Sequence, residues 1–264
     1  MHLVDVDDLT PEELHAVLDE AERLRTAHEA GETTRPLADK TLAMIFEKPS
    51  TRTRVSFETG MTQLGGHAIF LGPDDIHLGH GEPLRDTARV LSRYADFIMA
   101  RVFDHADVVE LAEFANVPVV NGLSDDAHPC QTLGDLLTIR DHFGDLDVSV
   151  AWVGDGNNVA QSLALGAAMT DLELTIATPE GYEIDDGVRK RTVGLDGPPE
   201  ETNDPTAAIA DADVVYTDVW VSMGQEEQRE EKLRTFEGFQ VTTELLGDRP
   251  LMHCLPAHRG EEVT

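Results

Sequence analysis

Residues 41–58 read TLAMIFEKPSTRTRVSFE, and this stretch decides the fold of the chain. The apolar run Thr41–Phe46 has the character of a strand, and Pro49 breaks it. Ser50 and Thr51 are favoured N-cap residues, so a helix can begin beside them. The residues that follow can bury one apolar stripe on this helix, made of Val55, Phe57, Met61 and Leu64. The stretch therefore predicts strand, turn and helix, with Ser-Thr-Arg-Thr-Arg at the helix N-terminus.

The start of this helix is predicted to bind an anion. Free backbone N–H groups, the hydroxyl groups and the guanidinium groups of Arg52 and Arg54 would converge on one point, and a phosphate suits that arrangement best. The alternative is an ordinary capped helix with solvated arginines. Arginine is scarce in this very acidic chain, and two arginines placed two residues apart favour the anion site.

Length and composition indicate a globular protein. The 264 residues suffice for one large domain or two of ordinary size, and 41% of them are hydrophobic, so a core can form. No apolar run reaches the length of a membrane span. Residues 1–5 carry acid where a signal peptide would carry positive charge, so we expect a soluble, cytoplasmic protein without a membrane partner.

The charge balance excludes one class of partner. The chain has 51 Asp and Glu against 20 Lys and Arg, a net charge of -31, and only four of the basic residues are lysine. Such a chain will not bind nucleic acid through a general basic surface. The acid is spread along the sequence, as in halophiles that stay soluble in salt. A phosphate site here must be locally positive, so the position of each arginine matters.

No cofactor is predicted. Cys130 and Cys254 do not make a disulfide framework, and no Cys/His spacing indicates a structural zinc site. Gly154-Asp155-Gly156 follows a predicted strand, as in dinucleotide-binding proteins, but Val159 occupies the third glycine position. The next strand ends without the acid that would bind a ribose. A dehydrogenase is therefore disfavoured, and Asn157-Asn158 better suits a polar substrate.

Predicted strands and helices alternate along the chain. Strands besides the first are predicted at 67–71, 97–100, 117–121, 149–153, 174–177, 213–217 and 250–254, and helices at about 10–31, 84–94, 108–115 and 158–169. The segment 187–205 is rich in Gly, Pro and acid and is predicted to be a surface excursion. This order is typical of two doubly wound parallel-sheet α/β domains, residues 1–143 and 144–264, joined by a helix near residues 131–144.

Polar residues follow several of these strands, at the edge where open α/β sheets bind ligands. Arg101 ends one strand. His128 and Gln131 lie one turn apart after the next, where they can polarise a carbonyl and hold an amide nitrogen. Asp218 follows a later strand, and its carboxylate can bind an amine. Cys254 closes the last strand. A helix cap is the alternative for His128, and spacing alone favours a buried inert thiol for Cys254.

The motifs together resemble the aspartate/ornithine carbamoyltransferase family over nearly the whole chain. They are Ser-Thr-Arg-Thr at 50–53, Arg101, His-Pro-Cys-Gln at 128–131, Gly-Asp-Gly-Asn-Asn at 154–158, Asp-Val-Trp-Val-Ser-Met-Gly at 218–224 and His-Cys-Leu-Pro at 253–256. Ser-Met-Gly and His-Cys-Leu-Pro point to the ornithine branch. The resemblance implies transfer of the carbamoyl group of carbamoyl phosphate to the δ-amine of L-ornithine. The products would be L-citrulline and phosphate, in arginine biosynthesis or the arginine deiminase pathway.

The resemblance also implies the residues of the site. Carbamoyl phosphate would be bound by Ser50, Thr51, Arg52, Thr53, His77, Arg101, His128, Gln131, Cys254 and Leu255. L-Ornithine would be bound by Asn158, Asp218, Ser222 and Met223. Arg101, His128 and Cys254 would be catalytic, the first two by stabilising the developing oxyanion. Leu255–Pro256 would be a cis peptide bond.

The implied chemistry needs a neutral amine as the nucleophile. Free amines of this kind have a pKa near ~10.4, so desolvation and the arginine groups would have to favour the neutral form. Positioning two substrates would supply much of the rate. The resemblance implies no metal or organic cofactor. It implies a homotrimer, or a multiple of trimers, with active sites shared between subunits.

Two departures from the family's pattern stand out. His77 lies where the family usually has a glutamine that reaches a neighbouring subunit's carbamoyl phosphate, and a histidine can donate the same hydrogen bond. The chain also stops at Thr264, before the family's final helix, so we expect a fragment or a shortened member. One alternative is a carbamoyltransferase for another amine, against which Ser222-Met223-Gly224 argues. Another is a non-catalytic remnant that binds carbamoyl phosphate.

Overall fold

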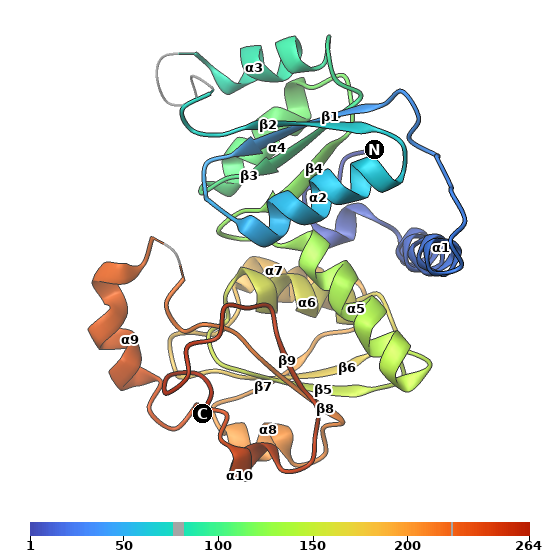
Figure 1. The fold of residues 1–264 in the computed structure, drawn as a ribbon. Coiled ribbons are helices and arrows are strands. Elements are labelled where there is room, and N and C mark those ends of the chain that lie inside the picture. The colour runs from blue at the N-terminus through green and yellow to red at the C-terminus, as the bar shows by residue number, and fades with distance from the viewer. Residues whose placement is uncertain (76–81, 223) are drawn as a thin grey trace. The chain divides into compact units, whose positions relative to one another are not determined.

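The computed structural model describes residues 1–75, 82–222 and 224–264. The chain divides into two compact units, residues 1–133 and 134–264, and each contains one sheet with helices packed on it (Figure 1). Within each sheet every neighbouring pair of strands is parallel. The prediction of two parallel-sheet α/β domains is therefore confirmed.

The first unit is built on a four-stranded sheet in the order β2-β1-β3-β4. Its strands are β1 (Thr41–Phe46), β2 (His67–Leu71), β3 (Phe97–Arg101) and β4 (Val119–Leu123). Its helices are η1 (Val6–Asp8), α1 (Pro11–Glu29), α2 (Thr51–Gln63), α3 (Leu84–Leu91) and α4 (His105–Phe114). Helix α5 (Pro129–Phe143) contains the division between the two units.

Local sequence explains how the central β1–α2 segment forms. All five residues of β1 after Thr41 are buried, as its apolar run predicts. Ser50 caps α2, because its hydroxyl accepts a hydrogen bond from the Thr53 N–H at 3.2 Å. The predicted apolar stripe on α2 is wrong in part: Met61 is buried, but Val55 is 54% exposed. Val55 lies six residues before Met61 and therefore points about 120° away from it around the helix.

The second unit is built on a five-stranded sheet in the order β7-β6-β5-β8-β9. Its strands are β5 (Ser149–Val153), β6 (Glu173–Ala177), β7 (Glu200–Thr202), β8 (Val214–Thr217) and β9 (Leu251–His253). Its helices are α6 (Asn158–Ala168), α7 (Asp186–Gly194), α8 (Pro205–Ile209), η2 (Glu226–Gln228), α9 (Arg229–Thr235) and α10 (Thr243–Leu246). The predicted strands of this half are confirmed to within a residue at each end.

The prediction of a surface excursion at 187–205 is wrong. The segment contains most of α7 and the whole of edge strand β7, which pairs with β6 from Thr175 to Ala177. Tertiary contacts override the Gly- and Pro-rich composition here. Thr192 is fully buried, and Arg189 bonds to Glu201 at 2.6 Å, which fastens the helix to the strand.

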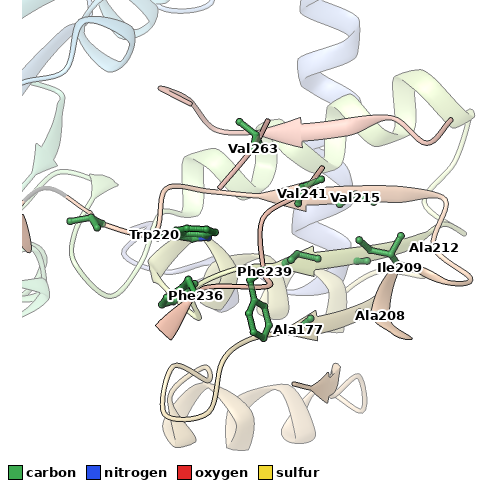
Figure 2. Close-up of a cluster of buried hydrophobic side chains, with 13 residues drawn as sticks. Ala177, Ala208, Ile209, Ala212, Val215, Trp220, Phe236, Phe239, Val241 and Val263 are labelled. Atoms are coloured by element: carbon green, nitrogen blue, oxygen red, sulfur yellow. The ribbon is translucent and has the colours of Figure 1, made fainter. Parts of the chain in front are cut away.

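A cluster of buried apolar side chains fills one side of the second sheet (Figure 2). Phe236 belongs to this cluster and is fully buried, with its ring 5.5 Å from that of Trp220 and 6.3 Å from that of Phe239. Trp220 belongs to the segment that follows β8. The cluster therefore fixes this segment beside the end of the strand. No helix in the described part of the chain is long and apolar enough to cross a membrane.

Candidate active site

Each sheet has one switch point, where successive connections leave in opposite directions. In the first unit the chain passes from β1 to β2 on one side, and β3 lies on the other side of β1. In the second unit β6 and β8 flank β5 in the same way. Ligands of open α/β sheets bind beyond the carboxyl ends of the strands at such points. Arg101 ends β3 at the edge of the first sheet, and Asp218 follows β8 at the edge of the second.

Ser50, Thr53 and Arg101 meet at the switch point of the first unit. Arg101 is the last residue of β3 and pairs in register with Phe46, the last residue of β1. Arg101 is only 7% exposed. Its Nη1 donates to the Thr53 hydroxyl at 3.4 Å, and the Thr53 and Ser50 hydroxyls are 3.0 Å apart. A guanidinium group and two hydroxyls thus lie against the N-terminus of α2. This arrangement suits a phosphate group, as predicted.

His128 and Gln131 lie where α5 begins. The Gln131 N–H donates to the His128 carbonyl at 3.0 Å, which puts both side chains on the first turn. The His128 Nδ1 is buried. Burial, with a smaller contribution from the positive charge of Arg101, lowers the pKa of His128 to about 3. His128 is therefore a neutral imidazole at physiological pH, able to donate one N–H to a polarised carbonyl oxygen.

The two arginines of α2 have different surroundings. Arg54 does not join the predicted point of convergence: its Nε bonds to Glu58 at 2.9 Å, and its guanidinium lies 3.8 Å from the centre of the Phe70 ring. Arg52 is exposed on the first turn, as Thr51 is. Of these two arginines, Arg52 is the one that remains a candidate to bind an anion. Burial raises the pKa of the Cys130 thiol, on the first turn of α5, to about 12, so this thiol is unreactive.

Lys48 is a residue of this unit that sequence reasoning does not find. It is 3% exposed, forms an ion pair with Asp125 and lies 4.5 Å from the centre of the Phe103 ring. The ion pair joins the turn after β1 to the loop before α5. A lysine between a glutamate and a proline carries no sequence signal of burial. The contact with Asp125, 77 residues away, exists only in the folded chain.

Asp218 is the centre of the polar cluster in the second unit. It follows β8 and is 5% exposed. One carboxylate oxygen accepts from the Asn157 amide at 2.9 Å, and the other accepts from the Cys254 thiol at 2.9 Å. Asn157 also caps α6, since its side-chain oxygen accepts from the Val159 N–H at 3.0 Å. The two predicted motifs that contain Asp218 and Cys254 are thus brought together at the ends of β8 and β9.

His253 supports the cluster from β9. Its Nδ1 accepts from the Leu255 N–H at 2.8 Å, so its Nε2 carries the proton and donates to Glu262 at 3.2 Å. Glu262 is fully buried. Burial opposes its ionisation, but the bonds from His253 and from the His258 backbone lower its pKa. Leu255–Pro256 is a cis peptide bond, as the resemblance implies.

Of the four remaining predicted site residues, the structure describes two, Asn158 and Ser222. Asn158 is the first residue of α6, beside the capping Asn157. Ser222 is half-buried in the loop after β8, and its N–H faces the Gln225 side-chain oxygen at 3.4 Å. His77 and Met223 lie outside the described residues.

Two groups of side chains among the described residues could hold a metal ion. They are Asp218, His253 and Cys254, and His258, Glu261 and Glu262, each with candidate ligand atoms within 4.8 Å of one another. In both groups the carboxylates already accept hydrogen bonds or an ion pair from protein groups.

Models of one protein family match both halves of the chain. The carbamoyl-P binding domain of aspartate/ornithine carbamoyltransferase matches residues 1–141, and the Asp/Orn binding domain of the same family matches residues 146–264. The two matches cover most of both structural units.

Several ornithine carbamoyltransferases are similar to this chain over its full length. An ornithine carbamoyltransferase of Haloquadratum walsbyi is 61% identical over 266 residues, which cover 100% of this chain and 87% of the relative. The solved structure of the Pyrococcus furiosus ornithine carbamoyltransferase is 51% identical with a TM-score of 0.94, and 100% of this chain matches 87% of it. The anabolic enzyme of Campylobacter jejuni matches with 40% identity, a TM-score of 0.94, and 100% and 88% coverage.

Two doubly wound units with polar residues at both switch points, matched over the whole chain by transferases, define a two-domain α/β transferase. The chain belongs to the aspartate/ornithine carbamoyltransferase family.

Proposed function

We propose that this protein transfers the carbamoyl group of carbamoyl phosphate to the δ-amine of L-ornithine, giving L-citrulline and phosphate in arginine metabolism. One observation carries the proposal: Asp218 and Cys254, from separate motifs of the ornithine branch, are in contact at 2.9 Å at the switch point of the second unit. The full-length similarity to ornithine carbamoyltransferases supports it.

Carbamoyl phosphate is proposed to bind to the first unit. The N-terminus of α2, the Ser50 and Thr53 hydroxyls and the guanidinium groups of Arg52 and Arg101 would hold the phosphate. His128 and Gln131 would hold the carbamoyl group. The complete proposed set adds Thr51, His77, Cys254 and Leu255.

L-Ornithine is proposed to bind to the second unit. The carboxylate of Asp218 would accept hydrogen bonds from the α-amino group, and Asn158, Ser222 and Met223 would complete the site. Asp218 suits this role because it is 5% exposed and the Asn157 amide and the Cys254 thiol hold its side chain in place. The Cys254 thiol, fixed by its bond to Asp218, would lie beside the reacting amine.

The proposed reaction is a substitution at the carbamoyl carbon. The neutral δ-amine forms the new N–C bond, and the C–O bond to phosphate breaks with its electron pair leaving on the phosphate. The departing phosphate takes the proton that the amine loses. Arg101 and the neutral His128 would stabilise the negative charge that develops on the carbamoyl oxygen. Binding both substrates supplies much of the acceleration through orientation, and the steps use no metal or organic cofactor.

We further propose a cytoplasmic enzyme that assembles as a homotrimer or a multiple of trimers. Both cysteines are free thiols, as expected in a reducing compartment. The trimer rests on the family resemblance, and light scattering in molar salt would measure it.

The test is citrulline formation from carbamoyl phosphate and L-ornithine by the 264-residue chain in molar salt. Arg52→Ala should abolish turnover and weaken carbamoyl-phosphate binding measured by calorimetry. Arg54→Ala is the matched control, because Arg54 bonds to Glu58 instead. The Arg54→Ala variant should keep both citrulline formation and carbamoyl-phosphate binding. Turnover of putrescine in place of ornithine would favour a transferase for another amine, and binding of carbamoyl phosphate without turnover would favour a non-catalytic protein.

A further inference from the structure

Lys232 is a buried lysine that the proposed reaction does not use. It lies in the run EQREEKLRT, residues 227–235, where the charged and polar neighbours in sequence suggest a solvated helix. In the structure it is 3% exposed, on α9. An ammonium group is rarely buried without a partner, because desolvating a charge is costly. Its surroundings therefore indicate what it does.

Asp155 holds the Lys232 ammonium in place. The Lys232 Nζ donates to the Asp155 carboxylate at 2.5 Å, and the centre of the Tyr182 ring lies 5.5 Å away. Asp155 is in the turn after β5, two residues before Asn157, which bonds to Asp218. Burial raises the pKa of Asp155, and the positive charge of Lys232 opposes that shift. The ion pair thus ties α9 to the turn that forms the switch point.

Lys232 also holds the loop that follows β8. Its Nζ donates to the Gln225 side-chain oxygen at 2.7 Å. The same oxygen lies 3.4 Å from the Ser222 N–H, and the Gln225 N–H donates to the Ser222 carbonyl at 3.0 Å. Ser222 and Gln225 are therefore bonded to each other, and the Lys232 ammonium holds Gln225. Lys232 is thus the charged side chain, within the part of the chain that the structure describes, that bonds to Gln225.

A second contact fastens the same loop to the same helix. Trp220 lies two residues before Ser222, and its ring packs on Phe236 at 5.5 Å (Figure 2). Phe236 is the C-cap residue of α9, one turn beyond Lys232. The loop is thus attached to α9 by an aromatic contact at its start and by the Lys232–Gln225 bond further on.

We propose that Lys232 is a positioning residue for the amine substrate: fixed by Asp155, it holds Gln225 and through it Ser222, and so sets the affinity for ornithine without touching it. The proposal rests on the proposed function, because Ser222 is one of the residues assigned to ornithine. It adds a role for two residues, Lys232 and Gln225, outside the substrate site.

A purely structural role for Lys232 makes a different prediction. Buried ion pairs contribute little net stability compared with apolar residues of similar volume, whereas removing one partner destabilises strongly. If the pair only filled space, cutting its link to Gln225 while leaving the pair intact would change nothing in catalysis. If Lys232 positions the loop, the same cut would weaken ornithine binding.

The deciding variant is Gln225→Leu, which keeps the Lys232–Asp155 pair and removes the link to Ser222. Its KM for ornithine should rise about tenfold or more, since a hydrogen bond to a charged group is lost. Its KM for carbamoyl phosphate should change less than about twofold. Gln225→Glu keeps an oxygen acceptor and should restore most of the affinity. Lys190→Met, at an exposed lysine of α7, is the control and should match the wild type.

A second variant tests Lys232 itself. Lys232→Met combined with Asp155→Asn removes the pair without leaving a buried charge alone, so the chain should fold. It should raise the ornithine KM in the same direction as Gln225→Leu. An unchanged ornithine KM in folded Gln225→Leu would overturn the proposal, and so would an equal rise in the KM of both substrates.

Hydrogen exchange separates this proposal from the proposed function. Amides of residues 219–222 and 224–228 should exchange faster in Gln225→Leu than in the wild type, while those of β5 and β8 stay protected. If the wild-type chain makes no citrulline, the proposed function fails, and the exchange rates still show whether Lys232 orders the loop. Equal exchange in wild type and variant refutes the positioning role whatever the activity.

Discussion

Lowering the pH from 7 to 5 should destabilise the first unit by about 2 kcal/mol through His128 alone. Burial and Arg101 lower the pKa of His128 to about 3 in the folded protein, while an unfolded histidine has a pKa of about 6.5. Between these values the unfolded chain binds a proton that the folded chain does not. Stability is therefore complete above about pH 6.5 and is lost as the pH falls, by about 1.4 kcal/mol per unit.

Urea unfolding at pH 7 and pH 5, followed by circular dichroism in the same molar salt, would measure this effect. Many acids also titrate in this range, so the useful quantity is a difference between proteins. The pH-dependent loss should be about 2 kcal/mol larger in the wild type than in His128→Gln, which has no imidazole to protonate. His15→Gln removes an exposed histidine of α1 and should behave like the wild type.

NMR gives an independent check, because the His128 ring resonances should keep the shifts of a neutral imidazole down to about pH 4. The reasoning would be wrong if the wild type and His128→Gln lost the same free energy between pH 7 and pH 5. It would also be wrong if His128 titrated near 6.5. Either result would mean that the imidazole is solvated and could be protonated during catalysis.

Three further changes test the second unit. Phe236→Ala should cost about 3–5 kcal/mol of unfolding free energy, since the ring is fully buried, and the tryptophan fluorescence transition in urea would report it. Tyr216→Phe should cost about 1–3 kcal/mol in the same assay, because Asp135 loses a hydroxyl donor at 2.9 Å. Cys254→Ala should lower kcat/KM for ornithine about tenfold in the citrulline assay, because Asp218 loses the thiol that holds it at 2.9 Å.

Each of these has an outcome that contradicts it. A loss below about 1 kcal/mol in Phe236→Ala would mean that the cluster in Figure 2 is loosely packed. Wild-type stability in Tyr216→Phe would mean that water replaces the hydroxyl. Equal kcat/KM for Cys254→Ala and the wild type would remove the thiol from the proposed mechanism.

The positions of most strands along the chain could be predicted because their signals are local. The apolar run of β1 and the N-cap at Ser50 each depend on a few adjacent residues, and both are confirmed. Polar residues at strand ends could also be placed, since parallel strands present their carboxyl ends at one edge. The meeting of Asp218 with Cys254 follows from β8 and β9 being neighbours in the sheet.

What could not be predicted depends on contacts between distant residues. Helix α7 has few buried side chains and two glycines, so its sequence resembles a loop, and Arg189 with Glu201 supplies the missing constraint. The burial of Lys48 and Lys232 has no sequence signal either, because each has charged or turn-forming neighbours. Each partner lies 77 residues away along the chain.

The separation of exposed acids from buried cations makes the capture of an anionic substrate depend on the salt concentration. The net charge of -31 belongs mostly to exposed acids, whereas Arg101, Lys48 and Lys232 are enclosed. At 0.01 M salt the screening length is about 30 Å, so an approaching phosphate meets the repulsion of the whole surface before it meets the arginines. At 1 M it is about 3 Å, and only the groups it touches count. Dissolved salt therefore controls the capture rate of the substrate while leaving the enclosed charges unchanged.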